Sequence, residues 1–167
     1  MRLLFLLPAL AFATCTQQQN NIHRLNAKID SLQQKLEASY KPGFGEIMLG
    51  IQMHHAKLWF AGTNKNWKLA AFEIDEMKEG LEDIQKYDSN RPESKSISMI
   101  NGAIDSTGNA IQQKNAQQFK KSFIFLTNTC NSCHRATNHE FNVVTIPNNP
   151  PVTNQDFRQA AMEQTGK

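Results

Sequence analysis

The chain of 167 residues is 40% hydrophobic and 20% charged, and its formal net charge is +3. This composition excludes a fibrous or wholly disordered protein and fits one folded domain with appendages. The net charge is too small to indicate binding to nucleic acid.

The first 14 residues have the layout of a secretory signal peptide. Arg2 precedes an apolar run from Leu3 to Ala13, and this run is too short to span a membrane as a stable helix. Pro8 and the absence of a polar face argue against the alternative, a cytosolic N-terminal helix. We therefore expect the chain to be exported and residues 1–14 to be removed.

The apolar run ends in Ala13-Thr14-Cys15, which resembles the end of a bacterial lipoprotein signal. In that family the cysteine is lipidated and becomes the first residue of the mature protein. The resemblance implies a lipid anchor at Cys15 and a location on the periplasmic or cell-envelope face of a membrane. The alternative is ordinary cleavage near Ala13, which would leave an unpaired thiol in an exported protein.

Residues 15–40 read as a polar spacer followed by a heptad-patterned helix. Ile22, Leu25, Ile29, Leu32 and Leu36 recur at alternating spacings of three and four residues. This is the a and d pattern of a coiled coil over about two heptads. The pattern predicts a helix, and it leaves two roles open: homo-oligomer formation through residues 22–36, or packing as a surface helix on the main domain.

Four further helices are predicted in residues 41–137, where breaker residues separate amphipathic segments. They run from Phe44 to Gly62, from about Asn64 or Asn66 to Tyr87, from about Glu93 past Ile111, and from about Asn115 through His134. Short connections between such helices predict an all-α fold, an antiparallel four-helix bundle preceded by the heptad helix. Residues 138–167 contain several Pro and Asn residues and are expected to form an irregular tail, with a short extended piece at 141–146.

The pentapeptide Cys130-Asn131-Ser132-Cys133-His134 ends the fourth predicted helix of the bundle. Two cysteines one helical turn apart can each form a thioether to one edge of a porphyrin, and the following histidine can bind the iron. The motif therefore predicts one covalent haem c, with Cys130 and Cys133 as attachment residues and His134 as the proximal ligand. These residues continue the apolar stripe of Phe119, Phe123 and Leu126, which predicts a haem in the bundle core.

The CxxC pattern also has two other uses in proteins. A thioredoxin-like redox pair belongs after a strand, at the start of a helix in an α/β fold. A zinc site would need a fourth ligand, for which His139 is available, but export makes unprotected thiolates unfavourable.

The arrangement resembles the class II, cytochrome c-prime-like proteins, in which CxxCH lies late in the last of four helices. In class I cytochromes the motif lies near the N-terminus and a ligating methionine follows, whereas here only Met162 follows His134. The resemblance covers residues 44–136, and the pentapeptide is its specific part. It implies that the first helix of the bundle faces the distal side of the haem.

His55 lies near the middle of the apolar stripe of that helix when residues are placed at 100° intervals. We predict His55 as the distal axial ligand and Met48, on the same stripe, as the runner-up. His54, at the edge of the stripe, could bind instead if the helix is rotated. The alternative for His55 is an ordinary buried histidine that is hydrogen-bonded to a backbone carbonyl or to water.

These residues predict an exported, lipid-anchored monohaem c-type cytochrome that exchanges electrons with redox partner proteins. Two strong axial ligands leave no vacant position on the iron, so an electron carrier is expected and not an enzyme. The first rival is a gas-binding or sensing protein with an open distal site. The second is an anchored structural module that assembles through its heptad helix and in which the haem is accessory.

Overall fold

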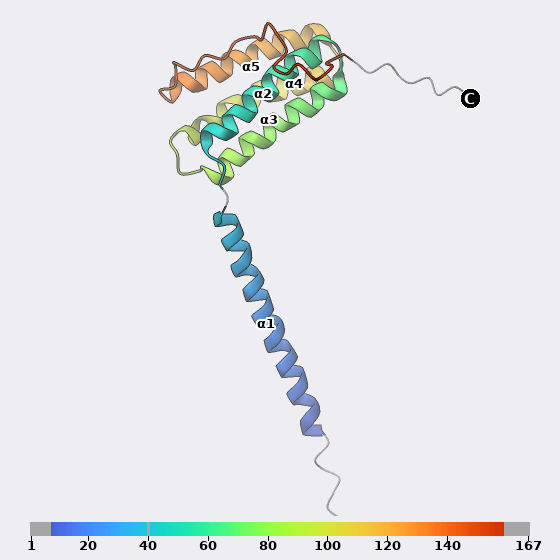
Figure 1. Cartoon of the computed structure of the whole chain (residues 1–167), viewed down its shortest axis with the longest axis vertical. Coiled ribbons are helices and arrows are strands. Elements are labelled where there is room, and N and C mark those ends of the chain that lie inside the picture. The colour runs from blue at the N-terminus through green and yellow to red at the C-terminus, as the bar shows by residue number, and fades with distance from the viewer. Residues whose placement is uncertain (1–7, 40, 159–167) are drawn as a thin grey trace, which may run out of the picture. The chain divides into compact units, whose positions relative to one another are not determined.

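The computed structural model describes residues 8–39 and 41–158, without the side chains of residues 8–16 and 37–39. Its contacts divide the chain into a first unit that ends at Lys41 and a second that begins at Pro42. All regular elements of the described residues are helices, so the predicted all-α fold is confirmed (Figure 1).

The first unit contains one helix, α1 (Pro8–Ser39). It begins fourteen residues before Ile22, earlier than the heptad pattern alone predicts. Residues 1–7 of the predicted signal peptide and the side chain of Cys15 lie outside the described residues. Signal cleavage and lipidation therefore stay predictions. Across the part of the chain that is described, no helix has the length and apolar character needed to cross a membrane.

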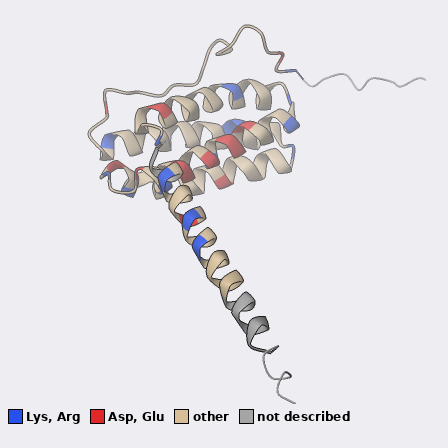
Figure 2. Ribbon diagram, turned by 60° about the horizontal axis from the view of Figure 1, so that its bottom comes forward, with Lys and Arg blue, Asp and Glu red and all other residues tan. Residues whose placement is uncertain are grey.

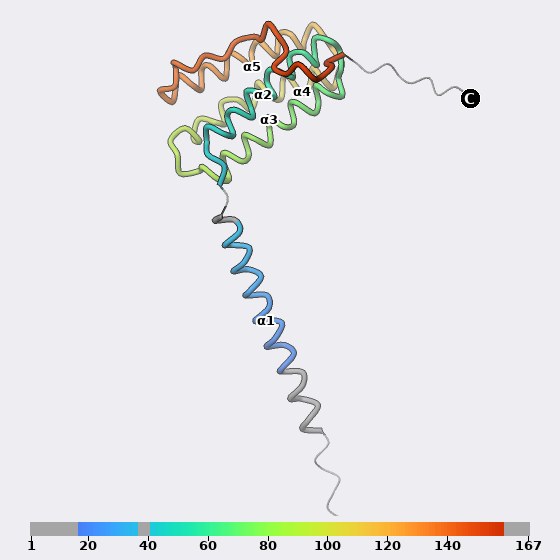
Figure 3. Tube along the Cα trace, viewed as in Figure 1, coloured from blue at the N-terminus to red at the C-terminus, as the bar shows by residue number. Residues whose placement is uncertain are grey.

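The second unit is a helical bundle. Its elements are α2 (Phe44–Thr63), α3 (Trp67–Tyr87), the 3-10 helix η1 (Glu93–Ile100), α4 (Asn101–Gln112) and α5 (Ala116–Ala136). In Figures 1 and 3 these helices lie side by side, with η1 and α4 following one another along the chain.

The contacts of α2 give the direction of its two neighbours. Towards α3, His54 Nδ1 lies 2.7 Å from Glu73 Oε2, and a Cβ on Gly80 would lie 2.8 Å from Ile51 Cγ1. Later residues of α2 therefore contact earlier residues of α3. The same is true of α5, because His55 contacts Thr127 and Trp59 contacts Phe123. Both neighbours run antiparallel to α2.

The third predicted helix differs from the expectation, because its first eight residues are a 3-10 helix. The buried residues of η1 are Ser94, Ile97 and Ile100, and their spacing of three matches the three residues per turn of a 3-10 helix. Serine and β-branched residues also weaken the α-helix here. Gly102 and Gly108, whose type is unfavourable inside a helix, lie in α4, which is nevertheless a regular α-helix.

Two of the connections use the same dipeptide, Lys-Asn. Lys65 and Lys114 adopt φ of 60° and 51° after α2 and α4. The following residues, Asn66 and Asn115, cap the next helix by accepting hydrogen bonds from Leu69 N and Gln118 N. A left-handed residue after the helix end is the usual C-terminal stop, and asparagine is a preferred N-cap. Each tight loop therefore ends one helix and starts the next.

The packing of the core differs between the two ends of the bundle. Phe119 and Phe123, in the first half of α5, are fully buried and contact Trp59 at ring-centroid distances of 6.4 and 5.0 Å. Trp67 contacts Phe119 as well, so both tryptophans pack against the core. The second half of α5 carries Cys130, Cys133 and His134 and borders a cavity instead.

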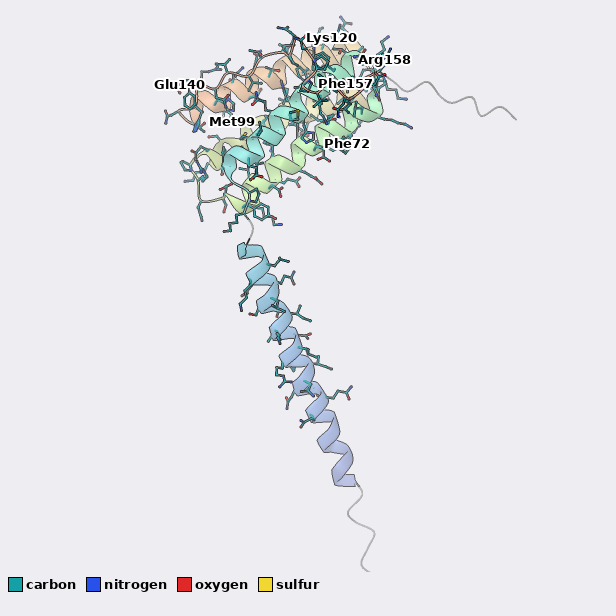
Figure 4. The ribbon with its side chains drawn as sticks, viewed as in Figure 1. Phe72, Met99, Lys120, Glu140, Phe157 and Arg158 are labelled. Atoms are coloured by element: carbon teal, nitrogen blue, oxygen red, sulfur yellow. The ribbon has the colours of Figure 1, made fainter. Side chains whose placement is uncertain are left out.

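After α5 the chain turns back along the bundle as a C-terminal segment (residues 138–158) that has no regular structure (Figures 2 and 3). Figure 4 labels Glu140 near its start and Phe157 near its end, at opposite ends of the bundle. Ile146 packs against the core, and Phe157 is buried with its ring 5.7 Å from that of Phe60. The described part of the predicted tail is thus irregular but packed on the helices.

Candidate functional site

A cavity of about 370 Å³ lies beside the last turns of α5. This volume is within the range of small-molecule and cofactor sites. Its walls come from α2, α3, η1, α5 and the C-terminal segment. The cavity is bordered by Cys130, Cys133, His134, His55 and Met48. Its other apolar lining residues are Leu49, Ile51, Met77, Leu81, Ile97, Ile100 and Val144. Five residues that the sequence singled out thus border one apolar space.

The two cysteines are not joined by a disulfide, and both are partly buried. Burial raises the pKa of the Cys130 thiol to about 12, and the neighbouring Cys133 adds to this shift. Burial also raises the pKa of Cys133, whose Sγ lies 3.7 Å from the Ser96 carbonyl oxygen. Thiol exchange uses the thiolate, and burial disfavours the thiolate at both cysteines. A neutral thiol or thioether fits the site better.

His134 is held by the C-terminal segment. Its Nδ1 lies 2.6 Å from the carbonyl oxygen of Asn142. A carbonyl only accepts hydrogen bonds, so Nδ1 carries the proton and Nε2 keeps its lone pair. Histidines that bind metals commonly donate their other ring N–H to a backbone carbonyl in this way. The arrangement leaves Nε2 as the nitrogen that can bind iron.

Asn131, inside the pentapeptide, fixes the C-terminal segment beside His134. Its Nδ2 donates to the Val144 carbonyl and its Oδ1 accepts from the Val144 N–H, both at 2.8 Å. The chain reverses at the end of α5, where Asn138 has φ of 60° and His139 N donates to the His134 carbonyl at 2.8 Å. The reversal and the Asn131 pair together bring Asn142 to the imidazole.

His55 is buried, with 3% of its surface exposed. Its Nε2 lies 2.9 Å from Thr127 Oγ1, and this hydroxyl donates to the Phe123 carbonyl at 2.9 Å. The hydroxyl proton is therefore used, so His55 donates Nε2–H and keeps a lone pair on Nδ1. Burial lowers the pKa of His55 to about 4, and the imidazole is neutral at pH 7. Its partner is a side-chain hydroxyl, not the backbone carbonyl or water that the sequence alternative named.

The remaining candidates lie at different places. Met48 is half-buried on the cavity wall. His54 does not border the cavity, because its Nδ1 faces the buried carboxylate of Glu73. His139 makes a loop contact, with Nδ1 2.7 Å from the Thr137 carbonyl oxygen. Arg135 is exposed and donates to Ser132 Oγ.

A second cavity of about 220 Å³ adjoins the first and shares Met48, Cys133 and His134 with it. Arg91 borders this space and is paired with Glu93 at 3.2 Å. Among the described lining residues of the two cavities, Arg91 is the one lysine or arginine. It is therefore the cation available to an acidic group of a bound cofactor.

Sequence reasoning missed Arg91, Asn131 and Asn142. Arg91 lies in the loop before η1, and no spacing rule connects it to the pentapeptide. Asn131 occupies a variable position of the CxxCH pattern. The sequence shows that Asn131 lies inside the motif. It does not show that its partner is Val144, thirteen residues away in an irregular segment.

No three His, Cys, Asp or Glu side chains of residues 17–36 and 41–158 are grouped so that they could hold a metal ion. A tetrahedral zinc site would require such a group. Comparisons of the chain with protein-family models, curated proteins and solved structures give no match.

Proposed function

We propose that this chain is an exported monohaem c-type cytochrome that transfers one electron at a time to redox partner proteins. The observation that carries the proposal is the convergence of both thiols and an oriented His134 on one apolar cavity. The sequence alone supports export and a lipid anchor at Cys15. In this proposal the chain is an electron carrier and not an enzyme.

Cys130 and Cys133 are the attachment residues. Each thiol adds across one vinyl group of the porphyrin, so sulfur bonds to one carbon and the thiol hydrogen ends on the other. The addition is balanced and needs no oxidant. The thioethers formed are neutral, which suits a site where burial raises the pKa of both thiols.

His134 binds the iron through Nε2, the nitrogen left free by the hydrogen bond to Asn142. His55 is the proposed distal ligand and Met48 the runner-up, because both border the cavity. When bound, the haem supplies a one-electron couple between ferric and ferrous iron. The apolar walls exclude water from the site, and Arg91 pairs with an acidic edge group of the cofactor.

The hydrogen bond between His55 and Thr127 favours a second candidate function. While His55 donates Nε2–H to this hydroxyl, Nε2 cannot bind iron, and an apolar distal space remains for a small neutral gas molecule. A low-spin, six-coordinate spectrum of the ferric holoprotein that becomes high-spin in His55→Ala supports the electron carrier. A high-spin spectrum that His55→Ala leaves unchanged supports the gas-binding candidate.

The test of the proposed function is the intact mass of the full chain, exported by a host that attaches haem covalently. We expect the polypeptide mass plus one haem, because both thiols border the cavity. The double variant Cys130→Ser/Cys133→Ser should lose the added mass. The control Ser132→Ala, which changes the same pentapeptide without removing a thiol, should keep it. Polypeptide alone in the wild-type preparation contradicts the proposal.

A further inference from the structure

Helix α1 presents a row of large aliphatic side chains to solvent. Ile22, Leu25, Ile29 and Leu32 are between 51% and 58% exposed, and Leu36 continues their spacing. Burying each such side chain against a partner gains about 1.5–3 kcal/mol at most, so an apolar row of this kind indicates an interaction surface. The residues between them are polar or charged apart from Ala27. The surface is therefore one narrow seam along the helix.

We propose that residues 22–36 of α1 form a parallel, two-stranded coiled coil with a second copy of this chain. The proposal does not depend on haem binding. It commits the seam to one partner, one number of strands and one orientation.

The identity of the seam residues favours two strands. The a positions are Ile22, Ile29 and Leu36, of which the first two are β-branched, and Leu25 and Leu32 occupy d positions. In parallel coiled coils, β-branched residues at a combined with leucine at d favour dimers, whereas isoleucine at both positions, or leucine at a with isoleucine at d, favours larger assemblies. Because each copy carries the same seam, a second copy matches it residue for residue.

The flanking charges favour the parallel orientation. The g positions beside the seam include Lys28 and Lys35, and the e positions are Asn26 and Gln33. In an antiparallel pair, g residues face g residues, so lysines of the two helices would lie together and repel. In a parallel pair, g faces e of the partner helix, so Lys28 lies beside the Gln33 amide. Repulsion between these lysines therefore destabilises the antiparallel pair but not the parallel pair.

The length of the seam indicates a weak dimer. About two heptads is below the three to four that give an autonomous coiled coil. We therefore expect association to depend on protein concentration. A lipid anchor at Cys15 would raise the local concentration of the copies, and a parallel pair would place both anchors at the same end.

The test uses the full chain with Cys15→Ser, exported and loaded with haem, in sedimentation equilibrium over a wide range of concentrations. The weight-average mass should rise from that of one chain towards that of two. Ile29→Lys, at an a position, should weaken association at least tenfold. The matched control Ala27→Lys, two residues away on the outer face at an f position, should associate as the parent does.

Orientation is tested by oxidative cross-linking in the same background. Leu25→Cys should form a disulfide-linked dimer, because d faces d only in a parallel pair, while Ala27→Cys should not. The parent without an added cysteine controls for linkage through Cys130 or Cys133, so a failure of haem attachment would be recognised separately. A monomer at every concentration, a mass above two chains, association unaffected by Ile29→Lys, or no Leu25→Cys linkage would each overturn the proposal.

Discussion

Asn131 shows how a single residue can join the cofactor motif to a distant part of the chain. Its amide makes both hydrogen bonds that the Val144 backbone offers. Val144 is two residues from Asn142, whose carbonyl accepts the His134 Nδ1–H. Asn131 therefore positions the residue that orients the proposed iron ligand.

Replacing Asn131 with alanine should loosen the C-terminal segment around Val144. Two neutral hydrogen bonds contribute about 1 kcal/mol each, so we expect hydrogen exchange at the Val144 amide to quicken by about 10- to 30-fold. Exchange measured residue by residue in the holoprotein checks this. Asn128→Ala removes the same type of side chain from an exposed site on α5 and should leave the Val144 amide protected. Equal protection in Asn131→Ala would show that the segment is held by other contacts.

In the haem-free protein, where His55 binds no iron, this residue should make the stability depend on pH. Burial lowers its pKa to about 4 from 6.5. Between these values the unfolded chain binds a proton that the folded chain does not, so the free energy of unfolding rises with pH across this window. Going down from pH 6.5 to pH 4, His55 should cost up to about 3 kcal/mol of stability.

Chemical denaturation of the haem-free wild type and of haem-free His55→Gln at a series of pH values measures this contribution. Glutamine keeps a donor for Thr127 but cannot be protonated, so the difference between the two proteins should change between pH 4 and 6.5 and be constant above it. A difference that is constant throughout would mean that His55 titrates normally in the folded protein.

For single residues, the sequence predicted candidates that belong to a local motif or a helical pattern. It missed residues that reach the cavity only through the folding of the chain. Cys130, Cys133 and His134 could be predicted as one site because they lie within five consecutive residues, and they border one cavity. His55 was placed on a buried face by helical periodicity alone, and it is buried. Its partner Thr127 was missed, because it is 72 residues away and periodicity within one helix gives no information on contacts between helices.

Gly62 of α2 lies directly against the Phe119 ring of α5. A Cβ at this position would overlap the ring of Phe119, which is fully buried. Gly62 is therefore needed for the close contact of the two helices, although glycine within a helix costs about 1 kcal/mol relative to alanine.

Gly62→Ala should destabilise the bundle by about 1–2 kcal/mol, because overpacking a core costs about 1–3 kcal/mol and exceeds the gain in helix propensity. Gly50→Ala is the matched control in the same helix, where an added Cβ would meet nothing within 4 Å. We expect it to stabilise by up to about 1 kcal/mol. Urea denaturation of both variants gives the comparison, and a stabilised Gly62→Ala would contradict the packing described here.

The helix boundaries could be predicted to within a few residues because their signals are local. Asn66 and Asn115 are recognisable caps, and Pro92 marks the start of the third segment. The 3-10 geometry of η1 could not be predicted, because its buried residues at spacing three also fit an α-helix. Their tertiary contacts decide between the two forms.

For the whole molecule, hydrophobic periodicity was sufficient to predict an all-helical chain, since each segment has its own apolar face. The course of the C-terminal segment was not predictable. Its proline- and asparagine-rich sequence excludes regular structure but does not indicate where the chain runs. Ile146 and Phe157, its main apolar anchors, are single residues without any periodic pattern.

The division of the bundle into an aromatic half and a cavity half gives the two ends different roles. Trp59, Trp67, Phe119 and Phe123 fill one half with side chains. In the other half, the described side chains leave the cavity between them, and both cysteines border it. A bundle that is packed with side chains at one end and borders a cavity at the other is suited to hold a bound group at a defined position.

One wall of the cavity is built by the residues that are synthesised after the pentapeptide. Asn142 and Val144 complete it, and an exported chain that emerges N-terminus first delivers them last. Before these residues arrive, the cavity that both cysteines border lacks this wall. If the chain is the proposed cytochrome, this order of emergence would give an interval in which haem is attached before the wall is complete.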